Sequence, residues 1–143
     1  MAKILVCDDE RSICEMLDIA LRRENHRVET VQSGQAAKSK IDGALYDVII
    51  TDMSMENQES GLQLLHAAFA RDLFAAVIVM TAYGNVANAV ECMRRGAFDY
   101  IEKNSPQVDV YEMLAHKIDE AMERRRRDVR TIDLWERGKE AKL

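Results

Sequence analysis

The sequence has little cysteine and no long apolar run. No hydrophobic stretch approaches the length of about 20 residues that a membrane-spanning helix needs, so we expect no membrane segment. Cys7, Cys14 and Cys92 are too widely spaced for a zinc site and give no disulfide framework. Reduced thiols of this kind fit a cytoplasmic protein. The amino terminus leads from Met1 straight into a strand-like run, without the pattern of a signal peptide.

The net charge of −5 is unevenly distributed along the 143 residues. Residues 107–143 contain nine basic and nine acidic side chains, so the whole excess of negative charge lies in the first 106 residues. An acidic surface argues against nucleic-acid binding by this first part and fits a cation site better. The length suits one domain and a short tail.

Short apolar runs alternate with amphipathic stretches along the chain. The apolar runs predict five strands, at Lys3–Cys7, His26–Val31, Val48–Thr51, Ala75–Met80 and Phe98–Glu102. Apolar residues at helical spacing predict a helix after each strand, and Arg94-Arg95-Gly96 is a stop signal for the fourth helix. This alternation predicts a flavodoxin-like (βα)5 fold, an α/β doubly wound parallel sheet with helices on both faces.

The last helix is predicted over Asp109–Arg127 and has an unusual length. No proline or glycine interrupts the chain from Gln107 until Gly138, so one continuous helix would reach about Arg137. A globule of this size cannot cover such a helix, whose end should project or pair with another chain. We therefore expect a domain over residues 1–125 and a helical linker or tail over residues 126–143.

The run of four arginines at Arg124–Arg127 has two interpretations. Clustered arginines can bind nucleic acid. Acidic residues balance the run nearby, however, which favours a solvated helix face or a linker.

Polar side chains follow four of the predicted strands. Asp8 and Asp9 follow the first strand, Asp52 the third, Thr81 the fourth and Lys103 the fifth. Because the carboxyl ends of parallel strands share one edge of the sheet, we expect these side chains to converge. Three carboxylates in one cleft need a cation or raised pKa values, and Mg²⁺ takes oxygen ligands of this kind. A lysine and a threonine would then stabilise a phosphoryl group, which an aspartate can accept.

Each of these residues also has a plainer interpretation. Asp52 could cap the next turn, and the acids after the first strand could favour the dipole of the following helix. Thr81 could be an ordinary helix cap and Lys103 a solvated surface lysine. Their joint position after four different buried strands favours the functional interpretation.

These motifs together resemble the receiver domain of two-component response regulators, over roughly residues 1 to 125. The matching residues are Asp8-Asp9, Asp52 after DVIIT, Thr81-Ala82 after AVIVM and Lys103 after FDYIE. The sequence GAFDYIEK, together with the residues from Met93 that precede it, looks most like the receivers of AAA+ enhancer-binding transcription activators.

The resemblance implies a role for each matching residue. It implies that Asp52 accepts a phosphoryl group from a sensor histidine kinase. Asp9, Asp52 and the backbone carbonyl of Ser54 would bind Mg²⁺ directly, and Asp8 would act mostly through water. Thr81 would bond a phosphoryl oxygen.

Lys103 would pair with the phosphate and with the aspartates. Tyr100 matches the aromatic switch position, although it could be only a half-buried strand aromatic. Phosphorylation would change the surface around the fourth helix and fifth strand. Through this surface it would control self-association as a homodimer or the activity of a C-terminal output domain. Such a domain modifies itself but turns over no metabolite, so we do not expect an enzyme.

Two loops depart from the family pattern. The family usually has Met-Pro after the phosphoacceptor, whereas here Met55 is followed by Glu56 in a loop about one residue longer. The family's proline after the lysine is replaced by Asn104, so we expect a trans bond there, since a cis bond before a residue other than proline costs about 2.5–4 kcal/mol. The segment from Asn104 to Val108 resembles an insertion.

A Mg²⁺-dependent phosphatase of the haloacid dehalogenase type is the alternative function. It also uses an aspartate nucleophile at a strand end, but after the first strand and with a second aspartate two residues later. Here the candidate nucleophile Asp52 follows the third strand, and Ser54 occupies the later position.

Overall fold

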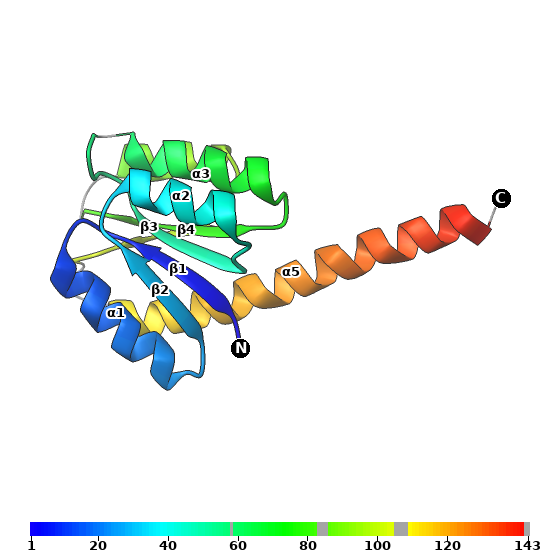
Figure 1. Cartoon of the computed structure of the whole chain (residues 1–143), viewed down its shortest axis with the longest axis horizontal. Helices are drawn as coiled ribbons and strands as arrows, with labels where there is room; N and C mark the ends of the chain where they lie inside the picture. The colour runs from blue at the N-terminus through cyan, green and yellow to red at the C-terminus, as the bar shows by residue number, and fades with distance from the viewer. Residues whose placement is uncertain (58, 83–85, 105–108, 142–143) are drawn as a thin grey trace.

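The structure, a computed structural model, describes residues 1–57, 59–82, 86–104 and 109–141, without the side chains of residues 86, 140 and 141. Its strands are β1 (Lys3–Cys7), β2 (Arg27–Val31), β3 (Val48–Asp52), β4 (Ala76–Thr81) and β5 (Asp99–Glu102). Its helices are α1 (Arg11–Arg23), α2 (Gly34–Gly43), α3 (Ser60–Arg71), α4 (Val86–Arg94) and α5 (Val110–Ala141). The predicted alternation of strands and helices is confirmed (Figure 1).

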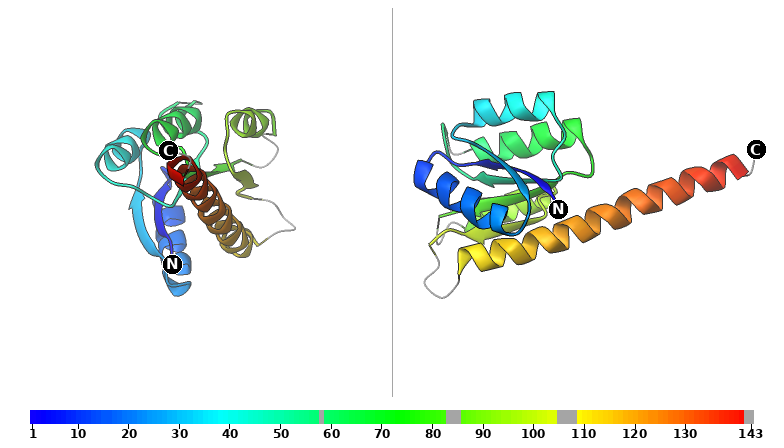
Figure 2. Two further views of the ribbon diagram at one scale, coloured as in Figure 1. Left: turned by 90° about the vertical axis from the view of Figure 1, so that its right-hand side faces the viewer. Right: turned by 60° about the horizontal axis from the view of Figure 1, so that its bottom comes forward.

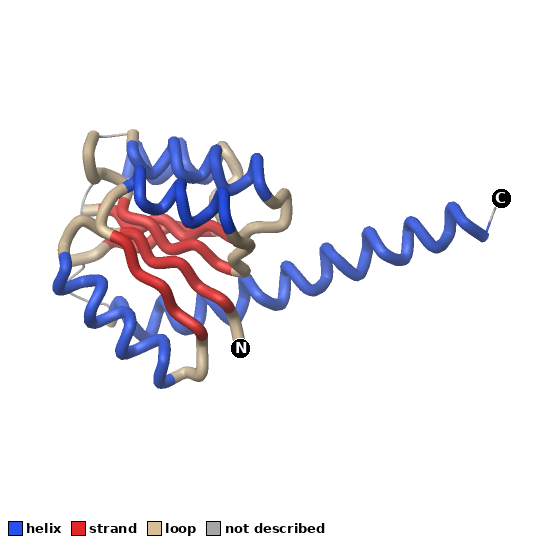
Figure 3. Tube along the Cα trace, in the orientation of Figure 1, coloured by secondary structure: helices blue, strands red, loops and turns tan. Residues whose placement is uncertain are grey.

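All strands pair in parallel, in the spatial order β2-β1-β3-β4-β5. This is the doubly wound sheet that the sequence predicts, and Figure 3 shows it between two layers of helices. Every residue of β3 and β4 is buried, because helices cover both faces of these central strands. The edge strand β2 is only partly buried, as its alternating sequence indicates.

Two hydrophobic clusters hold the layers together. On one face, apolar side chains of α1 and α5 pack on the sheet, including Leu17, Leu21, Leu114 and Ile118. On the other face, α2, α3 and α4 pack on the sheet. The crossovers therefore place helices on both faces and leave the carboxyl ends of the strands free to form a site.

Most boundaries differ from the predicted ones by one residue. The strand predicted over Ala75–Met80 lies at Ala76–Thr81, so Thr81 belongs to its end. The predicted stop at Gly96 is confirmed by its φ of 102°, a left-handed conformation that suits glycine. Among the described residues no peptide bond is cis, so the bond between Lys103 and Asn104 is trans, as expected. The remainder of the predicted insertion, residues 105–108, lies outside the described residues.

Helix α5 begins under the sheet and runs far beyond it (Figures 1 and 2). Its 32 residues continue past Gly138, where the sequence predicts an end near Arg137. A glycine in an exposed helix costs only about 1 kcal/mol relative to alanine, which is too little to end it. Every residue from 126 to 139 is exposed, so this part of α5 projects from the globule as expected. In the described part of the chain, no helix has the length and apolarity to cross a membrane.

The four consecutive arginines of α5, Arg124–Arg127, are not equivalent. Arg125 faces the globule, where its guanidinium forms ion pairs with Asp72 at 2.9 Å and with Asp47 at 3.2 Å. It also donates a hydrogen bond of 2.8 Å to the carbonyl of Phe74. Arg125 therefore ties α5 to the amino-terminal edge of the sheet at the point where the helix leaves it.

Candidate functional site at the carboxyl ends of the strands

The carboxyl edge of the sheet brings together the polar residues that the sequence singles out. Asp52 is the last residue of β3 and lies opposite Met80 of β4. Thr81, the last residue of β4, lies opposite Glu102, one residue before Lys103. Cys7 of β1 lies opposite Thr51, so Asp8 emerges beside Asp52. Parallel pairing in this register is the reason that residues distant in sequence share one site.

The Lys103 ammonium group lies at the centre of this site. Its Nζ is 2.8 Å from Asp8 Oδ2 and 3.1 Å from Asp52 Oδ2. The Asp8 side chain is fully buried, and those of Lys103 and Asp52 are only 10% exposed. Lys103 is therefore not a surface lysine. It neutralises two carboxylates that would otherwise repel each other in a place with little solvent.

Burial shifts the pKa values of all three groups. Loss of solvent raises the pKa of Asp52 to about 6, although the charge of Lys103 opposes this shift. The pKa of Asp8 is raised for the same reason, against its hydrogen bond from Lys103. Burial alone would lower the pKa of Lys103, but the hydrogen bond to Asp8 and the charge of Asp52 outweigh it, so that pKa is raised. The lysine therefore stays charged.

Three carboxylates after β1 are placed to hold a cation. Oxygen atoms of Asp8, Asp9 and Glu10 all lie within 4.8 Å of one another. Asp9 and Glu10 are exposed, so they can reach an ion from solvent. Asp52 is not a member of this cluster, but Lys103 Nζ contacts both Asp52 Oδ2, at 3.1 Å, and Glu10 Oε1, at 3.7 Å. Oxygen donors of this kind fit Mg²⁺.

Glu10 was not predicted as a site residue. It precedes α1, but its side chain makes no capping hydrogen bond, and its backbone N–H donates to Asp8 Oδ1 at 2.9 Å. The acidic side chains after β1 therefore lie towards the site and do not cap the amino terminus of α1. The sequence signal for Glu10 is its position directly after Asp8-Asp9.

The three other residues predicted for the site lie in or directly after the central and last strands of the sheet. Thr81 is fully buried, and its hydroxyl donates to the carbonyl of Ala82 at 2.9 Å. Tyr100 is partly buried and packs against the cluster on the α2–α4 face of the sheet. Ser54 is exposed in the loop after β3. It follows Met53, whose N–H donates to Met80 and whose carbonyl accepts from Gly61.

Comparison with known proteins gives a match over most of the chain. Residues 4–115 match the family of response regulator receiver domains. Over 117 residues the chain is 33% identical to the transcriptional regulatory protein ZraR of Klebsiella oxytoca. This alignment covers 79% of the chain and 26% of ZraR, so the chain spans about a quarter of that relative.

Two solved structures share the fold. NtrX from Brucella abortus superimposes with a TM-score of 0.85 at 28% identity, over 95% of this chain and 30% of NtrX. The response regulator protein TrrA from Thermotoga maritima, in complex with Mg(2+)-BeF, superimposes with a TM-score of 0.71 at 26% identity. That match covers 85% of this chain and 99% of TrrA.

Proposed function

We propose that Asp52 is the phosphoacceptor of this chain, which belongs to the family of response regulator receiver domains. This family is the phosphoacceptor part of two-component signal transduction. The observation that carries the assignment is the position of Asp52 at the end of β3, with its carboxylate 3.1 Å from Lys103 Nζ. The donor is a phosphohistidine of a sensor histidine kinase. Its phosphorus–nitrogen bond breaks as an Asp52 oxygen bonds to phosphorus, and the histidine nitrogen leaves with the electron pair.

Mg²⁺ is the proposed cofactor. Asp9, Asp52 and the backbone carbonyl of Ser54 would hold it, with Asp8 acting through water. The acidic cluster after β1 fits this ion, and the Mg(2+)-BeF complex of TrrA supports it. When bound, the ion adds positive charge beside the phosphoryl oxygens.

Thr81 and Lys103 complete the proposed site. Lys103, already beside Asp52, would pair with the phosphoryl group, and the Thr81 hydroxyl would turn from Ala82 to a phosphoryl oxygen. Tyr100 would turn inward as Thr81 moves, which makes it the proposed switch. These movements would change the surface of α4 and β5, where Val90 and Met93 of α4 are exposed.

The output of this switch is proposed to be transcriptional. ZraR is a transcriptional regulatory protein about four times as long as its match to this chain, which supports a C-terminal output domain. We propose that residues 1–125 form the receiver domain and residues 126–143 a linker or tail. The projecting part of α5 and the exposed α4 residues would support a homodimer. Three free cysteines fit a cytoplasmic location, where the kinase would act.

A phosphatase of the haloacid dehalogenase type is not favoured. The family match assigns the chain to receiver domains, and Asp52 lies on the third strand, with Ser54 where the phosphatase has its second aspartate. We propose that the domain modifies itself and turns over no metabolite. Steady release of phosphate from small phosphoesters would contradict this proposal.

Intact-mass measurement after incubation with acetyl phosphate and Mg²⁺ tests the proposed function. One added phosphoryl group is expected on the wild-type chain. The adduct should disappear in Asp52→Asn and in EDTA, which together identify the acceptor and the need for metal. Absence of the adduct from the wild type, or its persistence in Asp52→Asn, would overturn the assignment.

A further inference from the structure

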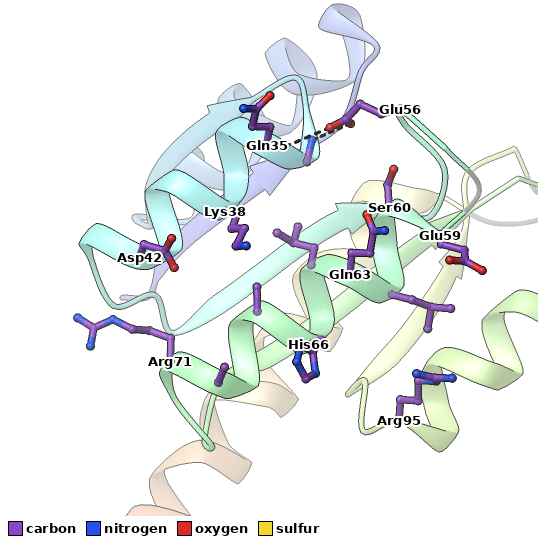
Figure 4. A pocket seen from close by; sticks show the side chains of 15 residues that line it. Gln35, Lys38, Asp42, Glu56, Glu59, Ser60, Gln63, His66, Arg71 and Arg95 are labelled. Atoms are coloured by element: carbon purple, nitrogen blue, oxygen red, sulfur yellow. Dashed lines mark hydrogen bonds between the residues drawn. The ribbon is translucent and has the colours of Figure 1, made fainter.

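The loop after β3 makes an unexpected contact with a distant helix. Glu56 stands where the receiver family usually has proline, and its carboxylate reaches the amino terminus of α2 (Figure 4). Its Oε1 accepts a hydrogen bond of 2.8 Å from the N–H of Gly34. Its Oε2 accepts one of 3.1 Å from the N–H of Gln35. More than 20 residues separate the partners in sequence.

This contact completes the hydrogen bonding of the first turn of α2. A helix leaves its first four N–H groups without partners inside the helix. The Ala37 N–H makes the first helical bond, to the Ser33 carbonyl at 3.0 Å, and the Ser33 side chain accepts from the N–H of Ala36 at 3.1 Å. Glu56 accepts from the N–H groups of Gly34 and Gln35, and the helix dipole favours its negative charge there. The hydrogen bond from Gly34 accordingly lowers the pKa of Glu56.

Gly34 allows the carboxylate to come this close. A Cβ atom at this position would lie 3.2 Å from Glu56 Oε2, which is tighter than ordinary contact. The helix therefore begins with the residue that gives the carboxylate the most room.

The same loop is held at two other points. Met55 Sδ lies 3.2 Å from Cys7 Sγ, which itself lies 3.3 Å from the carbonyl oxygen of Ser33. On the other side of Ser54, the backbone of Met53 bonds to Met80 and Gly61. The exposed Ser54 is thus flanked in sequence by Met53, which is bonded to β4, and by Met55 and Glu56, which contact β1 and the start of α2.

We propose that Glu56 is a positioning residue for the metal site, because it holds in place the loop that carries the Ser54 carbonyl, a proposed ligand of the ion. This inference rests on the proposed function, which assigns the Ser54 carbonyl to Mg²⁺. A proline at this place would stiffen the loop through its ring. Glu56 stiffens it instead through two charge-assisted hydrogen bonds to α2. Glu56 itself does not bind the ion.

The test compares two variants that each remove one negative charge from this loop. Glu56→Gln leaves one amide oxygen for two N–H groups and turns its own NH₂ group towards one of them. Glu59→Gln is the matched control, since Glu59 is exposed and its carboxylate makes no capping bond to α3. The full chain of each variant is titrated with Mg²⁺ alone by calorimetry. Amide hydrogen exchange of Gly34 and Gln35 is measured in parallel.

We expect Glu56→Gln to weaken Mg²⁺ binding about tenfold, the lower end of what loss of an outer supporting contact costs a metal site. Exchange at Gly34 and Gln35 should become faster in the same variant. Glu59→Gln should match the wild type in both measurements. A purely structural role for Glu56 would lower the unfolding temperature but leave the dissociation constant unchanged.

The outcomes separate the two proposals. If the wild type binds Mg²⁺ and Glu56→Gln binds it equally well, the positioning role is wrong and the proposed function stands. Equal weakening by both variants would assign the effect to charge alone and would also overturn the positioning role. If the wild type does not bind Mg²⁺, the proposed metal site itself is wrong, and the inference falls with it.

Discussion

Lys103 Nζ lies 2.8 Å from Asp8 Oδ2, and the Asp8 side chain is fully buried. This buried ion pair also depends on Asp52, which contacts the same ammonium group from β3. Removal of the lysine would leave two carboxylates in a place with little solvent and without their cation.

We therefore predict that Lys103→Met lowers the free energy of unfolding by about 3 kcal/mol, the typical cost of removing one partner of a buried ion pair. Urea unfolding in EDTA measures this loss, and added Mg²⁺ should recover part of it because the carboxylates then regain a cation. Lys38→Met is the control, since Lys38 is exposed. An unchanged urea midpoint for Lys103→Met would show that the pair contributes no net stability.

Arg125 should contribute far more to stability than its neighbours in the arginine run. Its side chain is only 18% exposed and contacts Asp47, Asp72 and the carbonyl of Phe74. Arg125→Met should lower the free energy of unfolding by about 2 kcal/mol, as expected for loss of hydrogen bonds to charged groups. Arg126→Met, at an exposed position, should change it by less than about 0.5 kcal/mol. Equal effects in thermal or urea unfolding would contradict the anchoring role.

His26 should make the stability of the domain depend on pH. Its Nδ1 accepts a hydrogen bond of 3.0 Å from the N–H of Ala2, which requires a neutral ring. Burial and the positive amino terminus lower its pKa below the ordinary 6.5, although Asp119 and Glu24 act in the opposite direction. The unfolded chain then binds the proton first as pH falls, so this contribution to stability is complete above about pH 6.5 and is lost below it.

The comparison of wild type with His26→Gln isolates this effect. Glutamine can still accept the hydrogen bond from Ala2 but does not titrate. The unfolding free energy of the wild type minus that of His26→Gln should be constant above pH 7 and should decrease as pH falls towards 5. A constant difference over the whole range would exclude the predicted coupling.

The projecting part of α5 should be dispensable for folding. Residues 126–139 are exposed, whereas Arg125 still contacts the globule. A chain ending at residue 127 should therefore unfold in one cooperative step with the same midpoint as the full chain. If self-association of the full chain uses Ile132 or Trp135, sedimentation should show that the shorter chain loses it. A midpoint lowered by many degrees would contradict the proposed boundary after residue 125.

The alternation of strands and helices and the residues of the site centre could be predicted because both depend on local patterns. Apolar β-branched runs mark the buried strands, and the polar residue after each run marks the shared edge. Topology then brings Lys103 to the same edge as Asp8 and Asp52, and the resemblance to receiver domains implies the pairing that the structure shows. Thr81 lies at the carboxyl edge, as predicted, although the strand is shifted by one residue and includes it.

The contacts of Glu56 and Arg125 could not be predicted, because each joins elements that the sequence does not bring together. In the sequence Glu56 is one of several polar residues in a loop, and no neighbouring residue indicates that its side chain reaches the start of α2. For Arg125 the sequence gives a partial indication. This residue continues the helical spacing of the buried residues Ile118 and Ala121, which indicates that one arginine of the run faces the sheet but does not indicate its partners.

The single unbroken helix α5 has a mechanical consequence. From Arg125 to Ala141 it extends about 24 Å beyond its last anchor, at 1.5 Å per residue. It is also tied to β5, since Lys117 Nζ lies 2.9 Å from Asp99 Oδ2. A tilt of about 10° at these anchors would carry the tip sideways by about 4 Å, given that helical rise. A single rigid helix of this length therefore converts a small rotation beside β5 into a displacement of several ångströms at its far end.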